Sequence, residues 1–435
     1  MNMNRFITTA MIIAAYCAGT LSAQERTNNG GLPRFAVISD IHFENNRGEG
    51  AKVKVPRALK NLLGKTPRVD AVFVVGDLTE RGKAEEYEQL VAAFGDRSNV
   101  PEGVDVYFML GYNHDVHAGE NCLENYLTIV GQPLYHYVEI KGYPFIAISE
   151  WGADAVRSDE ARQFLSDRLE DAVRKYPGKP VFVFTHLPPR NTCYGSSEND
   201  GDFGSNALLP VLNQYPQAIV FTGHTHFPLG DPRSIHQDKF TTVNDGGTAY
   251  SEVEPGVVDI GIHPENYEYV TEGVIVNVTA DNDVEIERWD TYRNEEILPR
   301  WLVEAPHDGS RFTYKNRDGF PAPVFPRGTR PTVKNTGGSA VAVTFPQAAD
   351  NDVVHHYIVE IKDDRQTVGS FRIFSQYYLS SHMPKQLTVN FSDLPAGKKL
   401  TAQVKAVDSY NNQSAPVVSK TFRIPASKNK NSVNK

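Results

Sequence analysis

Aspartate, histidine and asparagine side chains recur in this 435-residue sequence directly after short apolar runs. These runs end in Asp40-Ile41-His42, Gly76-Asp77, Asn113-His114-Asp115, Thr185-His186 and Gly223-His224-Thr225-His226. Carboxylates and neutral imidazoles coordinate divalent first-row metals, and one Asp can bridge two ions through its two oxygens. Two ions about 3.5–4 Å apart can hold a hydroxide between them and stabilise an in-line displacement at phosphorus. The residue types therefore favour hydrolysis of a phosphoric ester by attack of a metal-bridging hydroxide.

Each motif has an ordinary structural explanation when it stands alone. Asp40 and Asp77 are compatible with strand-end turns, Asn113 with a helix cap, and His186 with a buried structural histidine. Their ordered arrival at the ends of successive predicted strands favours function, because α/β sheets bind ligands at the carboxyl ends of their strands. We therefore expect these side chains to converge.

The segments that must position these residues alternate between strands and helices. Near-continuous apolar runs predict strands covered on both faces, over residues 35–39, 71–75, 106–110, 144–148, 181–184 and 218–221. Helical spacing predicts helices over 84–94 and 158–176, the second with Ser158 as its N-cap and acidic residues in its first turn. This alternation predicts an α/β layered domain over residues 24–300.

The pattern changes after this domain. Residues 301–322 are rich in proline and glycine and predict a linker or wrapping segment. Short alternating runs follow, over 340–345, 357–361, 387–389 and 400–406, and they predict a small all-β sandwich over residues 323–425. The run Leu400–Ser414 makes this region resemble a fibronectin type III module, although Leu400 stands where that family usually has Tyr. Residues 426–435 are predicted to be a polar tail.

The first residues differ from the rest of the chain. A basic start at Arg5, an apolar stretch over 6–17 and a small-residue exit at Ala23 predict a cleaved signal peptide over 1–23. The alternative is a membrane anchor, which the shortness of the run disfavours. We therefore expect a periplasmic or secreted protein without a transmembrane anchor after cleavage. In that oxidising compartment Cys122 and Cys193 are expected to form a disulfide, with two buried thiols as the alternative.

The net charge of -9 argues against general affinity for duplex nucleic acid and is compatible with a small phosphate-ester substrate. With their spacing, the five motifs resemble the signature blocks of the calcineurin-like metallophosphoesterase superfamily, over roughly residues 33–290. The resemblance implies a four-layer sandwich, with two central sheets flanked by helices, and a dinuclear metal centre. It implies that Asp77 bridges the two ions and that His114 protonates the leaving oxygen or stabilises the transition state without binding metal. By the same resemblance one ion takes Asp40, His42 and His226, and the other takes Asn113, His186 and His224.

Some residues depart from the family pattern. Tyr112 replaces the usual glycine before Asn113 and is a candidate substrate contact, as is Arg190 in the polar segment 190–205. The tyrosine with which purple acid phosphatases bind ferric iron is missing after Asp77, so Mn, Fe or Zn as divalent ions are expected. The motif set is most similar to the phosphodiesterase branch, which slightly favours a diester substrate. The alternatives are a monoester phosphatase or nucleotidase, and a non-catalytic binding or adhesion protein with a structural metal site.

Overall fold

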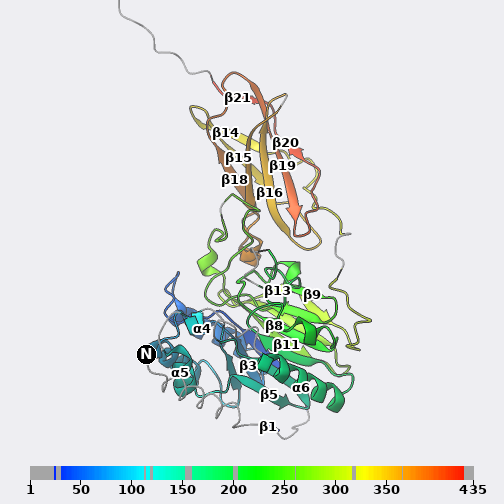
Figure 1. The fold of residues 1–435 in the computed structure, drawn as a ribbon. Helices are drawn as coiled ribbons and strands as arrows, with labels where there is room; N and C mark the ends of the chain where they lie inside the picture. The colour runs from blue at the N-terminus through cyan, green and yellow to red at the C-terminus, as the bar shows by residue number, and fades with distance from the viewer. Residues whose placement is uncertain are drawn as a thin grey trace, which may run out of the picture. The chain divides into compact units, whose positions relative to one another are not determined.

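The computed structural model describes residues 24–25, 31–111, 114–117, 121–151, 159–198, 204–259, 261–315, 320–364 and 366–425 (Figure 1). The chain divides into two compact units: one comprises residues 1–229, 233–253 and 266–315, and the other 230–232, 254–265 and 316–435. The predicted signal peptide over 1–23 and the predicted tail over 426–435 lie outside the described residues.

The first unit contains two mixed β-sheets. One has the strand order β1 (Gln24–Glu25), β5 (Tyr135–Ile140), β6 (Tyr143–Ile148), β7 (Val181–Thr185), β8 (Ala218–Thr222), β10 (Thr241–Asn244) and β9 (Ile235–Gln237). The other has the order β13 (Glu295–Val303), β12 (Val284–Asp290), β11 (Glu272–Val278), β2 (Arg34–Ile38), β3 (Ala71–Val75) and β4 (Asp105–Met109). Strands β2, β3 and β4 are parallel, as are β6, β7, β8 and β10. The carboxyl ends of neighbouring parallel strands therefore lie at one edge of each sheet.

Strand β2 shows how the layers are held together. Phe35 and Val37 point into the core between the two sheets, whereas Ala36 and Ile38 pack on the helix side. All four side chains are fully buried, because both faces of the strand are covered. The ring of Phe35 lies edge-on to five other phenylalanine rings, from Phe73, Phe145, Phe182, Phe184 and Phe221. The inner core is thus largely aromatic.

Helices cover the outer faces of both sheets. Helices α2 (Ala51–Leu63) and α3 (Ala84–Gly95) pack on the six-stranded sheet, and α6 (Asp159–Lys175) and α7 (Leu209–Leu212) pack on the seven-stranded one (Figure 1). The short helices α4 (His114–His117) and α5 (Cys122–Asn125) follow β4. This arrangement confirms the predicted four-layer fold. Ser158, the predicted N-cap of α6, lies outside the described residues, and Asp159 and Glu160 occupy the first turn.

The first unit extends beyond residue 300, the predicted end of the catalytic domain. Strand β13 continues through Val303, because Trp301 and Val303 are buried in the core between the sheets. Residues 304–315 remain with this unit, and the backbone of Tyr314 is hydrogen-bonded to Gln237. The first half of the predicted linker is therefore part of the folded first unit.

The second unit contains two antiparallel sheets around a core of their own. The first sheet has the order β14 (Thr332–Gly337), β15 (Ala340–Pro346) and β18 (Gln386–Phe391). The second has the order β17 (Thr367–Phe374), β16 (Val354–Lys362), β19 (Lys399–Asp408) and β20 (Val417–Val418), and β21 (Phe422–Arg423) also pairs with β19. Along β19 the side chains from Leu400 to Ala406 alternate between buried and half-buried, as a strand with one face on a core requires. This region is all-β, as predicted.

Candidate metal centre

The loops after four strands bring the described candidate ligands together. Asp40 and His42 follow β2, Asp77 follows β3, His186 follows β7, and His224 and His226 follow β8. Backbone hydrogen bonds fix one loop against the next: Asp40 N donates to Gly76 O at 3.0 Å, and Gly223 N donates to His186 O at 3.1 Å. Residues far apart in sequence are thereby held in one place.

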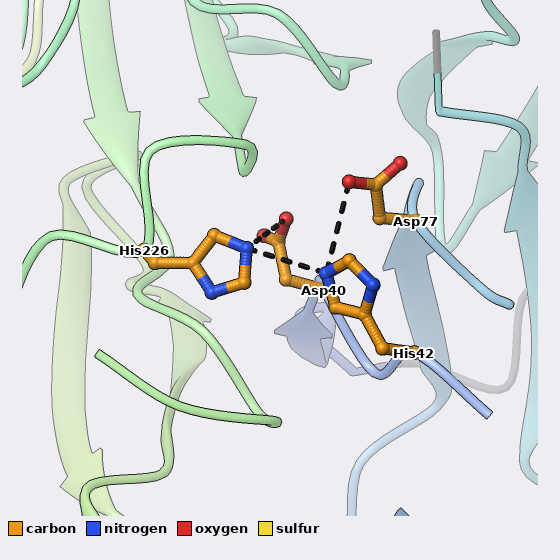
Figure 2. Close-up of side chains that lie close together, drawn as sticks. All are labelled: Asp40, His42, Asp77 and His226. Carbon is orange, nitrogen blue, oxygen red and sulfur yellow. Dashed lines mark hydrogen bonds and ion pairs between the residues drawn. The ribbon is translucent and has the colours of Figure 1, made fainter. Parts of the chain in front are cut away.

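Four of these residues form a first cluster, Asp40, His42, Asp77 and His226 (Figure 2). Their ligand atoms all lie within 4.8 Å of one another. His226 Nε2 is 3.2 Å from Asp40 Oδ1 and 3.3 Å from His42 Nε2, and His42 Nε2 is 3.7 Å from Asp77 Oδ2. Two carboxylates and two imidazoles thus face a common point, which suits a divalent first-row ion.

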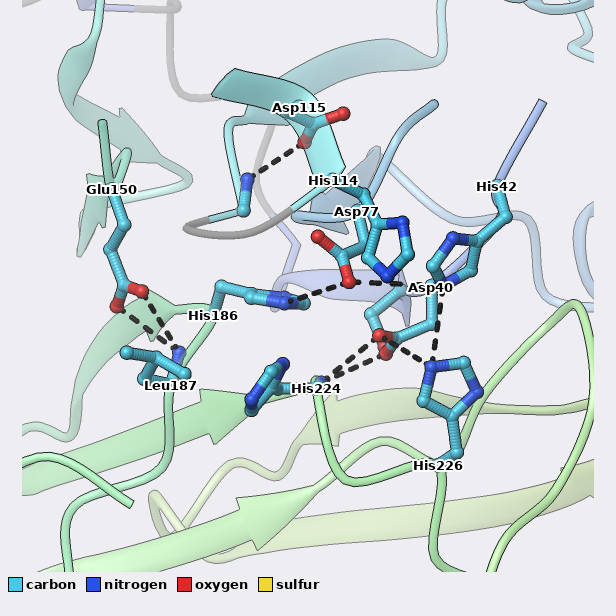
Figure 3. A network of polar contacts seen from close by, with 12 residues as sticks. Asp40, His42, Asp77, His114, Asp115, Glu150, His186, Leu187, His224 and His226 are labelled. Atoms are coloured by element: carbon cyan, nitrogen blue, oxygen red, sulfur yellow. Dashed lines mark hydrogen bonds and ion pairs between the residues drawn. The ribbon is translucent and has the colours of Figure 1, made fainter. Parts of the chain in front are cut away.

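A second cluster shares one residue with the first. It consists of Asp77, His186 and His224, again with ligand atoms within 4.8 Å of one another (Figure 3). His186 Nε2 lies 3.3 Å from Asp77 Oδ2. The Asp77 carboxylate therefore stands between two groups of potential ligands, as a bridging ligand would.

Backbone carbonyls orient two of the histidines. His186 Nδ1 donates to Val75 O at 2.8 Å, and His226 Nδ1 donates to Tyr250 O at 3.1 Å. A hydrogen bond at Nδ1 leaves Nε2 unprotonated in the neutral ring, with its lone pair directed at the cluster. The ring of Tyr250 also stacks on His226 with the centroids 4.2 Å apart, which limits rotation of the imidazole.

Buried polar atoms without hydrogen-bond partners also indicate that this donor set suits metal ions. Asp77 Oδ1 and His186 Nε2 are buried, yet neither has a hydrogen-bond partner among the described residues. An unsatisfied buried polar atom is costly, and a coordinated cation would remove that cost. Burial and the neighbouring His186 lower the pKa of His224 to about 3, so that this imidazole is neutral and able to bind metal. Although burial alone would lower the pKa of His226, the adjacent Asp40 carboxylate raises it to about 9, so a metal ion would have to displace a proton from this ring as it binds.

Five of the candidate ligands adopt a left-handed backbone conformation. The φ angles are 51° at Asp40, 45° at His42, 47° at Asp77, 68° at His224 and 54° at His226. This region is unfavourable for residues other than glycine, and such strain concentrates at functional sites. Gly76, directly before Asp77, also has a left-handed φ of 81°, and glycine is required there for a second reason, since a Cβ would collide with the ring of His186.

His114 lies at the side of the first cluster. Its ring is edge-on to His42, with the centroids 4.5 Å apart, and its Nδ1 is 3.1 Å from the carbonyl oxygen of Glu80. The carboxylate of Glu80 reaches His42, with 3.2 Å between Oε2 and Nδ1. Glu80 therefore contacts both histidines. The sequence motif placed Glu80 three residues after Asp77 but did not predict these contacts.

Asp115 joins two of the ligand loops. Its Oδ1 accepts hydrogen bonds from Thr79 N at 2.9 Å and Thr79 Oγ1 at 2.8 Å, and its Oδ2 accepts from Leu78 N at 3.1 Å and Gly111 N at 2.8 Å. The side chain is fully buried. Burial and the nearby Asp77 carboxylate raise the pKa of Asp115 to about 7, although the hydrogen bonds favour its charged form. Asp115 thus ties the loop of Asp77 to the loop that carries His114.

The remaining candidates lie elsewhere. Tyr112 and Asn113 are outside the described residues, as are residues 199–203 of the polar segment. The Arg190 guanidinium donates to Gly204 O at 2.9 Å and so helps to close that segment. Arg190 is in neither ligand cluster, and its predicted contact with substrate stays a prediction.

The predicted disulfide is wrong. Cys122 and Cys193 are both buried thiols. Cys122 Sγ lies 3.5 Å from Arg81 O, whereas Cys193 Sγ lies 3.8 Å from Thr222 Oγ1. Each sulfur packs against the backbone or hydroxyl of a different loop, and burial raises the pKa of Cys193 to about 12.

Comparisons with known proteins agree with this geometry. Residues 33–228 match the family described as calcineurin-like phosphoesterase. A 3',5'-cyclic-nucleotide phosphodiesterase of Nostoc sp. is 24% identical over 198 residues, which cover 44% of this chain and 71% of that protein. A probable glycerophosphodiester phosphodiesterase of Arcobacter nitrofigilis is 26% identical over 206 residues, which cover 43% of this chain and 70% of that protein.

Among solved structures, a purple acid phosphatase from yellow lupin aligns with a TM-score of 0.49 and 14% identity, over 67% of this chain and 58% of the other. Residues 33–228 thus form a calcineurin-like metallophosphoesterase domain, and the protein is a metal-dependent phosphoric ester hydrolase. No described helix is long and apolar enough to cross a membrane.

Proposed function

We propose that the protein hydrolyses phosphodiesters at a dinuclear metal centre. The observation that carries this proposal is the position of Asp77, whose carboxylate belongs to both ligand clusters. In this assignment Asp77 would bridge the two ions. One ion would be held by Asp40, His42 and His226, and the other by His186, His224 and Asn113, the last of which lies outside the described residues. Nitrogen and oxygen ligands of this kind suit Mn, Fe or Zn.

Two ions held there would supply Lewis acidity and a water molecule of lowered pKa as the nucleophile at neutral pH. Side chains and backbone groups of the protein orient the ligands and protonate the leaving group. His114 holds its ring between the Glu80 carbonyl and the edge of His42. Nδ1 donates to that carbonyl, and in the doubly protonated imidazolium form Nε2 also carries a proton, which it can give to the leaving alcohol as a general acid. The carbonyls of Val75 and Tyr250 keep His186 and His226 oriented throughout.

The preference for diesters is supported by the relatives, since the Nostoc and Arcobacter proteins are both described as phosphodiesterases. The test is a comparison of kcat/KM on bis(4-nitrophenyl) phosphate and 4-nitrophenyl phosphate, with protein that has been stripped of metal and reloaded in turn with Mn, Fe(II) or Zn. We expect faster hydrolysis of the diester and loss of activity on chelation.

The Asp77→Asn variant gives the matched control for this test, because it keeps the shape of the side chain but removes its charge. We expect at least a hundredfold lower kcat and weaker binding of one ion, read by metal titration. Preferential hydrolysis of the monoester would replace the proposal with a phosphatase or nucleotidase. Full activity in Asp77→Asn would contradict the metal assignment itself.

We also propose that the protein is exported, on the basis of the signal-like pattern over residues 1–23. N-terminal sequencing of the protein recovered from its native compartment checks this, and an N-terminus near Gln24 is expected. An intact N-terminus in the cytoplasmic fraction would contradict it.

The second unit is proposed to be a fibronectin type III-like module. One of its sheets contains β14, β15 and β18, and the other contains β17, β16, β19 and β20. This order is a Greek-key arrangement for such a sandwich. We propose that it spaces or docks the enzyme rather than catalysing a reaction. Expression of residues 1–315 alone tests this, and retention of kcat on the aryl diester is expected.

A further inference from the structure

The two carboxylate oxygens of Asp40 have different surroundings. Oδ1 lies 3.2 Å from His226 Nε2, within the first ligand cluster. Oδ2 accepts a hydrogen bond from the hydroxyl of Ser39. The backbone N–H of His224 lies 3.2 Å from Oδ1 and 3.0 Å from Oδ2 (Figure 3). Ser39 thus engages Oδ2, and Oδ1 is the oxygen that Asp40 presents to the cluster.

The Ser39 hydroxyl also contacts a second carboxyl group. Its Oγ lies 2.5 Å from Oδ1 of Asp245, a fully buried residue directly after β10. Backbone hydrogen bonds join the same two loops, because Thr248 N donates to Ser39 O at 3.2 Å and Ala249 N donates to Asp40 O at 2.9 Å. Asp245 belongs to neither ligand cluster, but it is placed to act on Asp40 through Ser39.

The hydrogens available in this contact bear on the protonation of Asp245. A serine hydroxyl has a single hydrogen, yet Ser39 Oγ lies within hydrogen-bond distance of an oxygen of each carboxyl group. If both groups were ionised, one of these oxygens would face the hydroxyl oxygen with no hydrogen between them. Asp40 is the ionised group, since it accepts from His224 N and is a candidate metal ligand. A neutral Asp245 supplies the missing hydrogen.

The second oxygen of Asp245 agrees with a neutral group. Asp245 Oδ2 is buried and has no hydrogen-bond partner among the described residues. An ionised carboxylate buried without a donor is much more costly than a neutral carboxylic acid in the same place. The next loop also leaves room for the contact, since a Cβ on Gly223, directly before His224, would collide with Ser39 Oγ and Asp40 Oδ2.

We propose that Asp245 is a positioning residue of the metal centre. Asp245 donates a hydrogen bond to Ser39 Oγ, and Ser39 donates to Asp40 Oδ2, so that Asp40 Oδ1 stays directed at the first cluster. This inference rests on the proposed function and adds two residues that hold one of its ligands in place. The hydrogen-bond partners of metal ligands typically change metal affinity by about 10–100-fold when they are substituted.

The test is a Zn titration of the metal-stripped protein against a chromophoric chelator, in which Asp40→Asn identifies the binding step of the first cluster. In Asp245→Leu we expect this step to weaken about tenfold or more, since no group then donates to Ser39. In Asp245→Asn the amide can donate as the acid does, so the affinity should stay within about twofold of the wild type. Asp290→Leu is the matched control, because it removes a buried carboxylate outside both clusters, and its Zn affinity should equal that of the wild type.

Two further measurements separate this role from a merely structural one. The double variant Ser39→Ala/Asp245→Leu should bind Zn no more weakly than Ser39→Ala alone, because Asp245 acts through Ser39. The infrared difference spectrum between the wild type and Asp245→Asn should contain the C=O band of a protonated carboxylic acid at neutral pH. This band tests the protonation of Asp245 even if Asp245→Leu does not fold.

Wild-type Zn affinity in Asp245→Leu or in Ser39→Ala would overturn the proposal. Equal weakening in Asp245→Asn and Asp245→Leu would do so too, because the charge of Asp245 would then matter rather than its hydrogen bond. Additive losses in the double variant, or no protonated-acid band from Asp245, would also contradict it. These results leave the proposed function intact, whereas a wild-type protein that binds no Zn, Mn or Fe(II) would overturn the proposed function itself.

Discussion

Asp115 allows a sharp test of how the ligand loops are held. Each of its carboxylate oxygens accepts two hydrogen bonds, from donors on the loops after β3 and β4. In Asp115→Asn one oxygen becomes an amide nitrogen that can only donate. If the amide faces Thr79, the hydroxyl can turn to accept from it, but the N–H of Thr79 still faces a donor; if it faces Leu78 and Gly111, two backbone N–H groups do. Each buried donor left unsatisfied costs about 1–3 kcal/mol, and we expect a loss of about that size in the free energy of unfolding of the first unit.

The same substitution should affect catalysis through geometry. Asp115 follows His114 directly, and its partners Leu78 and Thr79 follow Asp77. Release of this connection lets the two loops shift, and a displacement of about 1 Å in a catalytic group can lower the rate about a hundredfold. We therefore expect a fall in kcat of that order, together with weaker metal binding.

The measurements are urea unfolding followed by circular dichroism, metal titration, and kcat on an aryl diester. All are made at pH 8.5, above the Asp115 pKa of about 7, so that the wild-type carboxylate is ionised. Asp281→Asn serves as the control, since Asp281 is exposed in the turn between β11 and β12 and a change there is expected to stay within about 0.5 kcal/mol. A stability loss in Asp115→Asn as small as in this control would refute the reasoning.

Three further outcomes are expected. Burial raises the pKa of Glu272 to about 8 from an ordinary 4.5, so the folded state holds this proton more tightly than the unfolded state. Stability should therefore fall as pH rises through that window, by up to about 1.4 kcal/mol per pH unit, and Glu272→Gln should flatten the slope in urea unfolding; an unchanged slope would contradict this. Phe35→Ala should lower the free energy of unfolding by about 3–5 kcal/mol and Phe35→Leu by less than half as much, and equal losses would argue against the aromatic core. Cys122 and Cys193 should not react with a thiol reagent in the native protein, and both should react after denaturation without reductant. No reaction after denaturation would show that the two cysteines form a disulfide.

The sequence predicted the parallel strands well because they are covered on both sides. The bounds of β3 agree with the predicted run, since five consecutive buried apolar residues leave little ambiguity. Helix α2 was missed, because it contains Pro56 and several lysines, and its buried stripe of Val55, Leu59 and Leu62 is short. Strands β11 and β12 were missed as well, since polar residues such as Glu287 interrupt their apolar pattern.

The site could be predicted only in part, for a related reason. The described candidate ligands converge because strand topology alone brings strand ends together. Glu80, Asp115 and Tyr250 act through contacts with other loops, and no local pattern predicts that Asp115 reaches the backbone of Leu78 or that Tyr250 stacks on His226. The disulfide prediction failed on the same point, since proximity to motif histidines does not determine which side of a loop a cysteine faces.

The left-handed backbone at Asp40, His42, Asp77, His224 and His226 has a consequence for how this protein can change. An L-residue in this conformation costs about 1–2 kcal/mol, a cost that glycine does not carry. Selection for folding alone would therefore drive these positions toward glycine, and only the need for donor atoms opposes that drift. A descendant freed from catalysis should gain stability as it loses its ligands. In this metalloenzyme the residues most necessary to activity are among those least suited to the fold that holds them.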